Sequence, residues 1–402
     1  MGSKAGVGFS DQTDSLAAGA EAAKQAMASA GLTRGDAALL FSTGRHNPHK
    51  LRDGVRSVIG PTCRLFGGYG VGIITHDHLA YDGHEVGIVI IQSDTWKIDA
   101  VIETGLPGNE RATGQRLGEK LVAGGLHPDD DLVLLYDSVN VAKGQPRLNM
   151  ATPLMAGMSQ HVKQWPDTAG MGMIGDMQLQ PTYQWFDDRI EQGSAMAIRF
   201  GGELRMDSII MHGCRPAGRY YTITRTEGPV VLEIDNKPAL SVIHDMLGPD
   251  GGLSPEDYSF FITLGVNKGD PYGPFKEDDY ANRMCIGIDS SRHGLVMFED
   301  DLQPGMKVQL MRRSMDFSYI GPRTKELLKR VEGRRPVFAF YIDCAGRAGA
   351  YCGLDAEEAV EVQKALPKEI PLLGVYSGVE IAKVGGAVQA LDWTGVLCLF
   401  SE

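Results

Sequence analysis

Long apolar runs are missing from this sequence of 402 residues, and no uncharged apolar stretch approaches the roughly 18 residues that a membrane-spanning helix requires. The N-terminal segment, MGSKAGVGFSDQTDS, has no apolar core of signal-peptide length. Basic clusters are missing too, and 39 basic against 51 acidic residues give a net charge of −12. We therefore expect a cytoplasmic protein without a membrane span, whose partner is neither nucleic acid nor an anionic membrane surface.

Motifs of familiar enzyme and metal chemistry are also absent. The six cysteines form no C-x-x-C pair, and no Cys or His spacing is typical of a zinc site. The sequence has no Walker loop, no H-E-x-x-H, no G-x-S-x-G and no dinucleotide fingerprint. We expect reduced, buried thiols and no metal site, and we lean away from an enzyme.

The composition itself is that of a globular protein, with 43% hydrophobic and 22% charged residues in a chain of 43.5 kDa. This length is typical of two domains. We place the boundary near Gly218, so that residues 1–217 form one domain and residues 218–402 the other. Because no Ser/Gly-rich linker marks the boundary, we expect the two domains to pack closely together.

A recurring pattern organises the chain: a strand-like apolar run, a helix, a glycine corner and a second apolar run. The corners of the three clear copies are Gly67–Gly72, Gly170–Asp176 and Gly374–Glu380. The expected helices are residues 48–59, 150–162 and 355–366, and the closing runs are 86–91, 195–200 and 395–400. A single corner would be a plain β-turn, but the ordered context indicates internal repetition.

A weaker fourth copy runs from Tyr258–Leu264 through Cys285–Asp289 to Met306–Met311. Four related units would make two domains of two units each. We therefore predict an α+β fold of two tandem domains, with mixed or antiparallel sheets flanked by helices and built from repeated β-α-β units.

Several segments resemble a known family, the FIST domains. His212–Pro216 and Leu232–Ala239 are similar to the start of a FIST C-terminal domain, and Ile342–Arg347 and Pro371–Ile381 resemble two of its later segments. Gly170–Asp176 resembles the G-x-x-x-x-G-D segment of a FIST N-terminal domain. The chain is thus identified as a tandem FIST protein over nearly its whole length.

This resemblance implies a sensory module in signal transduction that binds small ligands, with an amino acid or a similar zwitterion as the expected ligand. Such modules are fused to a signalling output domain or work beside one. Because the chain ends at Glu402, two residues after its last predicted strand, we expect the output to come from a separate partner protein. Some family members resemble haem-binding nitric oxide sensors, so a haem-based gas sensor is the alternative.

Polar residues at the ends of buried strands and in the glycine corners are the candidate ligand contacts, because ligands of layered α/β proteins bind on such loops. At the strand ends these are His46, Asn47, Asp137, Ser138, Asn267, Lys268, Cys344 and Arg347, and the corners add Asp176, Tyr376 and Glu380. Arg347 suits a ligand carboxylate, and Glu380 or Asp176 suits an ammonium group. The alternative is an internal ion pair between Arg347 and Glu380.

Two further hypotheses remain open. For haem, the candidate axial ligands are His161, His212 and His244, with His161 expected on a helix. For a thiol-dependent enzyme, Cys344 is the candidate nucleophile, although His244 and the other histidine of that domain lie far from it in the sequence. Apart from haem, we expect no cofactor.

Overall fold

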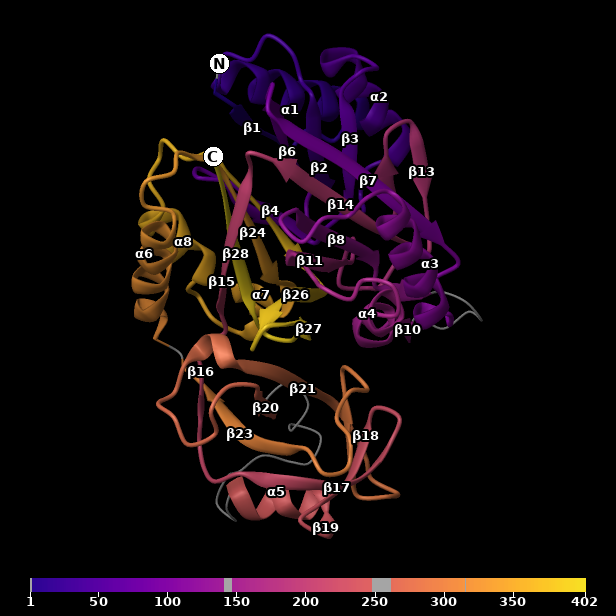
Figure 1. Ribbon diagram of the computed structural model, residues 1–402, viewed down its shortest axis with the longest axis vertical. Helices are drawn as coiled ribbons and strands as arrows, with labels where there is room; N and C mark the ends of the chain where they lie inside the picture. Colours follow the sequence, from indigo (N-terminus) through magenta and orange to yellow (C-terminus); the bar gives the residue numbers. More distant parts are fainter. Residues whose placement is uncertain (1, 141–146, 248–261, 315) are drawn as a thin grey trace. The chain divides into compact units, whose positions relative to one another are not determined.

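The chain forms two compact units (Figure 1). The computed structural model describes residues 2–140, 147–247, 262–314 and 316–402. The larger unit contains residues 1–211, 317–382 and 395–402, and the smaller unit contains residues 212–316 and 383–394. The predicted domain ranges 1–217 and 218–402 stay a prediction, because each compact unit draws on residues from both of them.

The larger unit contains three repeats with one element order: strand, helix, strand, helix, strand, hairpin and closing strand. The first repeat contains β1 (Lys4–Ser10), α1 (Ser15–Ser29), β2 (Ala37–Ser42), α2 (Pro48–Ile59), β3 (Arg64–Tyr69), β4 (Gly72–Ile74), β5 (Leu79–Tyr81) and β6 (Val86–Gln92). The second contains β7 (Trp96–Thr104), α3 (Glu110–Ala123), β8 (Asp131–Asp137), β9 (Val139–Asn140), β10 (Arg147–Leu148), α4 (Ala151–Met158), β11 (Asp167–Met173), β12 (Gln184–Phe186), β13 (Arg189–Glu191) and β14 (Ser194–Gly202).

The third repeat is interrupted by the smaller unit. Its strands and helices are β15 (Arg205–Met211), η4 (Phe317–Tyr319), α6 (Ile320–Arg330), β24 (Pro336–Cys344), η5 (Ala345–Arg347), α7 (Gly349–Cys352), α8 (Glu358–Ala365), β25 (Leu372–Ser377), β26 (Val379–Val384) and β28 (Gly395–Ser401). Each repeat has one parallel strand pair, β2–β3, β8–β11 or β24–β25, inside an otherwise antiparallel sheet. The predicted α+β fold with mixed and antiparallel sheets is therefore confirmed.

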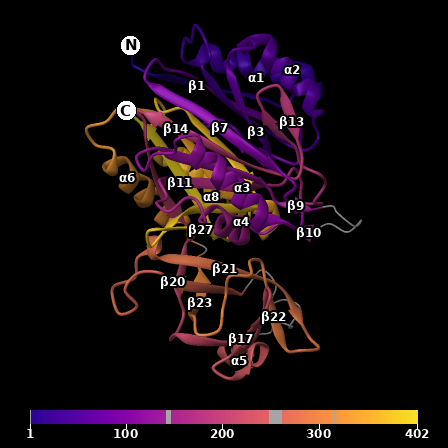
Figure 2. The same cartoon turned by 45° about the vertical axis from the view of Figure 1, so that its right-hand side comes forward.

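The three sheets exchange hairpins. Among the strands of the larger unit, the orders are β1-β6-β2-β3-β12-β13, β7-β14-β8-β11-β26 and β15-β28-β24-β25-β4-β5. In each case the outer side of the third long strand pairs with a hairpin strand from another repeat: Gly68 with Gln184, Gly172 with Val379, and Tyr376 with Gly72. The first repeat gives its hairpin to the third, the third to the second, and the second to the first, so the exchange is a closed cycle. Figure 2 shows the hairpin strand β13 of the second repeat beside the sheet of the first repeat, near β3.

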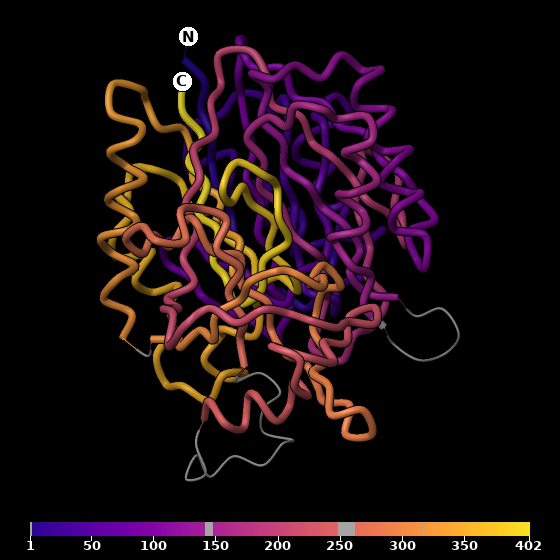
Figure 3. The backbone as a smooth tube through the Cα atoms, turned by 60° about the horizontal axis from the view of Figure 1, so that its bottom comes forward, coloured from indigo at the N-terminus to yellow at the C-terminus, as the bar shows by residue number. Residues whose placement is uncertain are grey.

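The inner faces of the three sheets share one aromatic core. Phe41 stacks on Phe340 at 5.4 Å, and Phe400 lies 4.3 Å from Phe338 and 5.1 Å from Phe200 (ring centroids). These rings come from all three repeats, so their burial stabilises the assembly of the sheets rather than any one repeat. The two ends of the chain also meet, because the Ser3 backbone N–H donates to the Glu402 carboxylate at 3.0 Å (Figure 3).

The helices cover the outer faces in pairs, and small residues let them approach. In Figure 1, α1 and α2 lie over the sheet of the first repeat. A Cβ on Gly8 of β1 would stand 1.9 Å from the Ala22 carbonyl of α1, so only glycine permits this contact. Ala18, Ala22 and Ala26 are buried on the face of α1 that packs against the sheet.

The predicted repeats are correct for three copies and wrong for the fourth. The helices expected at 48–59 and 355–366 are α2 and α8, while the one expected at 150–162 ends at Met158. Residues 258–261 of the fourth copy lie outside the described residues. From residue 262 to residue 313 the described chain contains antiparallel strands and a single 3-10 turn, η3 (Glu277–Asp279), but no α-helix, because its apolar runs pair directly with one another.

The smaller unit is an antiparallel sheet that closes on itself. Its order is β16-β23-β17-β18-β22-β21-β20, with β20 also paired to β23 and β19 to β18. The elements are β16 (Cys214–Pro216), β17 (Tyr221–Glu227), β18 (Val230–Ile234), β19 (Lys237–Pro238), α5 (Ala239–Leu247), β20 (Thr263–Asn267), β21 (Tyr280–Asp289), β22 (Gly294–Met297), β23 (Lys307–Arg313) and β27 (Ala387–Leu391). Residues 383–394 are fixed in this unit by Arg283, which donates to the Ala390 carbonyl at 2.8 Å.

No helix in the described parts of the chain has both the length and the apolar character needed to cross a membrane.

Buried carboxyl groups at the two ends of β8 predict an unusual pH dependence of stability. Burial raises the pKa of Asp131 to about 7 and that of Asp137 to about 6. The folded protein therefore binds these protons more tightly than the unfolded chain does. The stabilisation is fully present below the unfolded pKa, near 4, and is lost as the pH rises through 6 to 7.

We expect Asp137→Asn to flatten this dependence. Urea unfolding at several pH values between 4.5 and 8 should show that the wild-type slope exceeds that of the variant by about one proton between pH 6 and 4.5. The difference between the two proteins removes the opposing contribution of His46, whose pKa burial lowers. Parallel curves for the two proteins would contradict a protonated Asp137.

Candidate functional site

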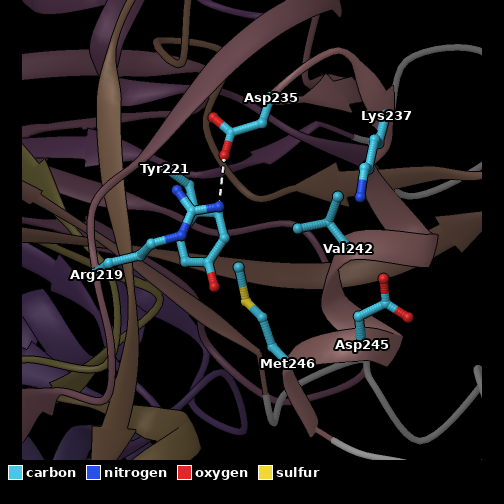
Figure 4. A pocket seen from close by; sticks show the side chains of 7 residues that line it. All are labelled: Arg219, Tyr221, Asp235, Lys237, Val242, Asp245 and Met246. Carbon is cyan, nitrogen blue, oxygen red and sulfur yellow. Dashed lines mark hydrogen bonds and ion pairs between the residues drawn. The ribbon is translucent and has the colours of Figure 1, made fainter.

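The smaller unit contains a hollow of about 190 Å³ between β17, the β18–β19 turn and α5 (Figure 4). We call it the Asp235 hollow, and its lining residues are Arg219, Tyr221, Asp235, Lys237, Val242, Asp245 and Met246. Two cations, two carboxylates and three largely apolar side chains thus face one small space. Concave sites with a few converging polar groups are where small molecules bind to proteins.

The turn between β18 and β19 positions the polar wall of the hollow. Asp235 and Asn236 both have a positive φ, at 50° and 61°, as a two-residue hairpin turn requires. The backbone N–H of Thr222 and the guanidinium of Arg219 each donate to the Asp235 carboxylate at 2.8 Å. These two donors, led by the Thr222 N–H, lower the pKa of Asp235, so its carboxylate is ionised at neutral pH.

Arg219 is held from two sides. Its guanidinium donates to Asp235 and lies 3.9 Å above the ring of Tyr221 (Figure 4). By contrast, neither Lys237 nor Asp245 forms an ion pair with any residue that the structure describes. The hollow therefore combines a fixed Arg–Asp pair with one cation and one anion that are available to a ligand.

Four of the residues predicted from the sequence do come together, in the larger unit at the ends of β24 and β25. Asp343 and Cys344 pair across the two strands with Tyr376 and Ser377. The Ser377 hydroxyl donates to the Glu380 carboxylate at 2.8 Å, and the Tyr376 hydroxyl donates to Glu357 at 3.2 Å. None of the predicted residues lines the Asp235 hollow, and ligand binding at Arg347, Cys344, Tyr376 and Glu380 stays a prediction.

Arg347 is fully buried and forms ion pairs with two carboxylates, those of Glu358 and Asp343. It also donates to the Met211 carbonyl at 2.5 Å and to the Tyr319 hydroxyl at 3.3 Å. Met211 is the last residue of the larger unit before the chain enters the smaller unit, and Tyr319 is among the first after it returns. Arg347 thus fixes both crossings of the chain from inside the larger unit.

The remaining predicted contacts serve local structure. Both ring nitrogens of buried His46 are hydrogen-bonded, Nδ1 to the Ser15 hydroxyl at 3.1 Å and Nε2 to the His84 carbonyl at 2.8 Å. Asn47 caps α2 by accepting the Lys50 N–H. Asp176 accepts two backbone N–H groups of its own turn, from residues 178 and 180.

The three candidate haem ligands lie far apart in the sequence and in different surroundings, and haem binding at any of them stays a prediction. His161 lies in the turn after α4 rather than on a helix, and His244 is exposed on α5. Buried His212 accepts the Cys214 N–H at Nδ1, and its Nε2 lies 3.3 Å from the Glu277 carbonyl. None of the three lines the Asp235 hollow. Among the described residues, no group of three or more His, Cys, Asp and Glu could hold a metal ion.

The environment of Cys344 opposes a nucleophilic role. The side chain is buried, and burial together with the charges of Glu380 and Asp343 raises the pKa of the thiol well above its ordinary value. A thiol becomes a nucleophile only as the thiolate, which this surrounding disfavours. Burial therefore argues against Cys344 as a nucleophile, and the thiol-enzyme hypothesis stays a prediction.

Sequence reasoning missed the Asp235 hollow although part of its signal is visible. Asp235-Asn236 between two alternating apolar runs is a hairpin signal, and it lies in Leu232–Ala239, the segment that resembles the start of a FIST C-terminal domain. The neighbouring charges, Arg219 and Asp245, belong to a loop and a helix whose approach to this turn depends on tertiary packing. No local sequence pattern predicts that this loop and this helix lie against the turn.

The chain belongs to the FIST family: residues 36–237 match the FIST N domain and residues 239–383 match the FIST C domain. This confirms the tandem arrangement expected from the sequence. FIST domains are a family of sensory domains in signal transduction.

Individual relatives add little about function. The chain is 24% identical to the uncharacterized protein Mb0898c of Mycobacterium bovis over 245 residues, which is 59% of this chain and 61% of that one. It is 24% identical to the uncharacterized protein Rv0628c of Mycobacterium tuberculosis over 204 residues, or 48% and 51% of the two chains. The chain thus spans between half and two thirds of these relatives' own length.

Among solved structures, cyanuric acid hydrolase from A. caulinodans matches 50% of this chain and 71% of its own, with 10% identity and a TM-score of 0.28. A likeness this weak carries no argument about fold or function.

The Arg347 network predicts a large loss of stability on removal of the cation. Arg347→Met leaves the carboxylates of Glu358 and Asp343 buried without it, and breaking such a pair costs about 3–5 kcal/mol. Urea unfolding measures this loss. Adding Glu358→Gln should recover part of it, whereas Arg45→Met, at an exposed position, should change little. If Arg347→Met were as stable as the wild type, the proposed stabilising role of the Arg347 network would be wrong.

Alkylation tests the state of Cys344. Cys352 is half-buried whereas Cys344 is 7% exposed with a raised pKa. We expect iodoacetamide to label Cys352 faster than Cys344 in the native protein, as read by mass spectrometry of timed samples. Urea-unfolded protein, in which both thiols are equally accessible, is the control. Preferential labelling of native Cys344 would restore the thiol-enzyme hypothesis.

Proposed function

We propose that this FIST protein is a cytoplasmic sensor of a small zwitterion, such as an amino acid, and that the ligand binds in the Asp235 hollow. The proposal moves the ligand site from the predicted Arg347 region of the larger unit to the smaller unit. A separate output protein would read the bound state.

One observation carries the proposal: the hollow presents a cation and an anion that have no ion-pair partner in the described chain. Lys237 is available to a ligand carboxylate, and Asp245 is available to a ligand ammonium. Both side chains are exposed and solvated in the free protein, and a ligand of complementary charge can replace that water. A zwitterion satisfies both groups at once, while a simple anion or cation satisfies one.

The rest of the hollow supports the same ligand class. Arg219 is already oriented by Asp235 and Tyr221, so little side-chain freedom is lost when it contacts a ligand. Val242 and Met246 of α5 give an apolar wall for a ligand side chain. The volume of about 190 Å³ is below the usual range of about 300–1,000 Å³ for ligand pockets, so it limits the ligand to a molecule as small as an amino acid and is too small for a tetrapyrrole.

Calorimetry and thermal shift against the twenty amino acids test the proposal. We expect at least one of them to raise the melting temperature of the wild-type protein. Lys237→Met and Asp245→Asn should each weaken its binding about tenfold or more, because each removes a charge-assisted hydrogen bond. Lys307→Met, an exposed lysine of the same unit outside the hollow, is the matched control.

Modified ligands assign the two ends of the molecule. The amide of the best amino acid lacks the carboxylate, so Lys237→Met should weaken its binding no further. The N-acetyl derivative lacks the ammonium, so Asp245→Asn should weaken that one no further. If no amino acid binds, or if binding is indifferent to both substitutions, the proposal is wrong.

A further inference from the structure

A second hollow, of about 500 Å³, lies in the larger unit beside the first strand of the chain. We call it the β1-edge groove. Its walls are β1 at Val7–Phe9, α1 at Gln25 and Ser29, the β4–β5 turn at 75–78, and the segment 368–372. Its size is within the range of ligand sites, and no part of the sensory proposal above uses it.

The groove follows an unpaired strand edge. β1 is the outermost strand of its sheet, and β6 is the one strand of the described chain that pairs with it. On its other side the Phe9 N–H donates to the Gln25 side-chain oxygen, and the Val7 carbonyl accepts from the Ser29 hydroxyl, both at 3.2 Å. Residues two apart in an antiparallel edge strand direct their backbone groups to the same side, so the Val7 N–H faces the groove as well.

These side-chain contacts stand where the backbone of a neighbouring strand would stand. Each of these two contacts to β1 is at the long end of the hydrogen-bond range, and the Ser29 hydroxyl also lies 3.0 Å from the Ala26 carbonyl of its own helix, so its single proton is shared between two carbonyls. Exposed edges of this kind are templates for strand addition. The same unit already uses such addition three times, because each of its sheets accepts a hairpin from another repeat.

The other walls of the groove provide apolar surface for the side chains of a bound peptide and a negative charge at the rim. Phe9 stacks on His78 with ring centroids 4.1 Å apart, and Pro371 and Leu372 add apolar surface. Lys368 is paired with Asp77 at 3.0 Å. Glu369 forms no ion pair with any described residue, so the charge left over at the rim is negative.

We infer that the β1-edge groove binds an extended peptide segment of a partner protein, which adds a strand to β1 and places a basic side chain at Glu369. Main-chain hydrogen bonds to Val7 and Phe9 would supply affinity, and the rim charge would supply selectivity.

The probe is the fluorescein-labelled peptide Ala-Lys-Ala-Lys-Ala-amide, followed by fluorescence anisotropy with the full chain. The matched probe is the same peptide with alternate N-methyl groups, which removes its main-chain donors and keeps its charge. We expect the parent peptide to bind about tenfold more tightly than the methylated one, since a few hydrogen bonds of about 1 kcal/mol each are lost.

Two substitutions locate the peptide. Val7→Pro deletes the outward N–H, and proline is tolerated on an edge strand, so the variant should fold and bind about tenfold more weakly. Val7→Ala keeps the N–H and should bind as the wild type does, which keeps the test valid if the proline variant fails to fold. Glu369→Gln should weaken the binding of the lysine peptide but not of an Ala-Ser-Ala-Ser-Ala peptide.

Absence of peptide binding, equal binding of the parent and methylated peptides, or equal binding by Glu369→Gln would each overturn the inference. Lys237→Met in the Asp235 hollow should leave peptide binding unchanged. Peptide binding and amino-acid binding are thus tested at different residues, so one proposal can fail while the other holds.

Discussion

Strand exchange among the three repeats is the constraint on which the larger unit depends. Each repeat ends its own sheet with a long strand whose outer edge is filled by a hairpin from another repeat, as where Gly72 pairs with Tyr376. A repeat on its own would expose that edge and lose its share of the aromatic core, so the three form one cooperative unit. The closed cycle leaves few free edges, and β1, where the groove lies, is one of them.

A buried arginine of this framework, Arg347, binds the two points at which the chain leaves the larger unit and returns to it. Arg347 binds the carbonyl of Met211 and the hydroxyl of Tyr319, on either side of residues 212–316, while Glu358 and Asp343 balance its charge. The residues around Arg347, which the sequence suggested as a ligand site, thus form a buried ion-pair network that stabilises the larger unit. The charges that remain available to a ligand lie in the smaller unit, around a hairpin turn and the short helix α5.

Much of the fold could be predicted, because the repetition of strand, helix and corner follows from local sequence periodicity. Three copies of the pattern, and the helices α2 and α8, lie where the sequence predicted them. The exchange of hairpins could not be predicted, because the strands that pair in it lie far apart in the sequence. The clustering of Cys344, Tyr376 and Glu380 was predictable from adjacent strand ends. The partner of Arg347 was not, because Glu358 lies on a helix whose packing the sequence does not reveal, and the Asp235 hollow was hidden for the same reason.

The central claim is that the small ligand is recognised in the smaller unit and not at the Arg347 centre. Methyl NMR of protein with labelled methionine and valine tests it most directly, because Met246 and Val242 line the hollow, while Met211 and Val362 lie in the core cluster beside the buried network of the larger unit. On titration with the best-binding amino acid, the account predicts that the signals of Met246 and Val242 shift first and furthest. Larger shifts at Met211 and Val362, with Met246 and Val242 unchanged, would contradict it.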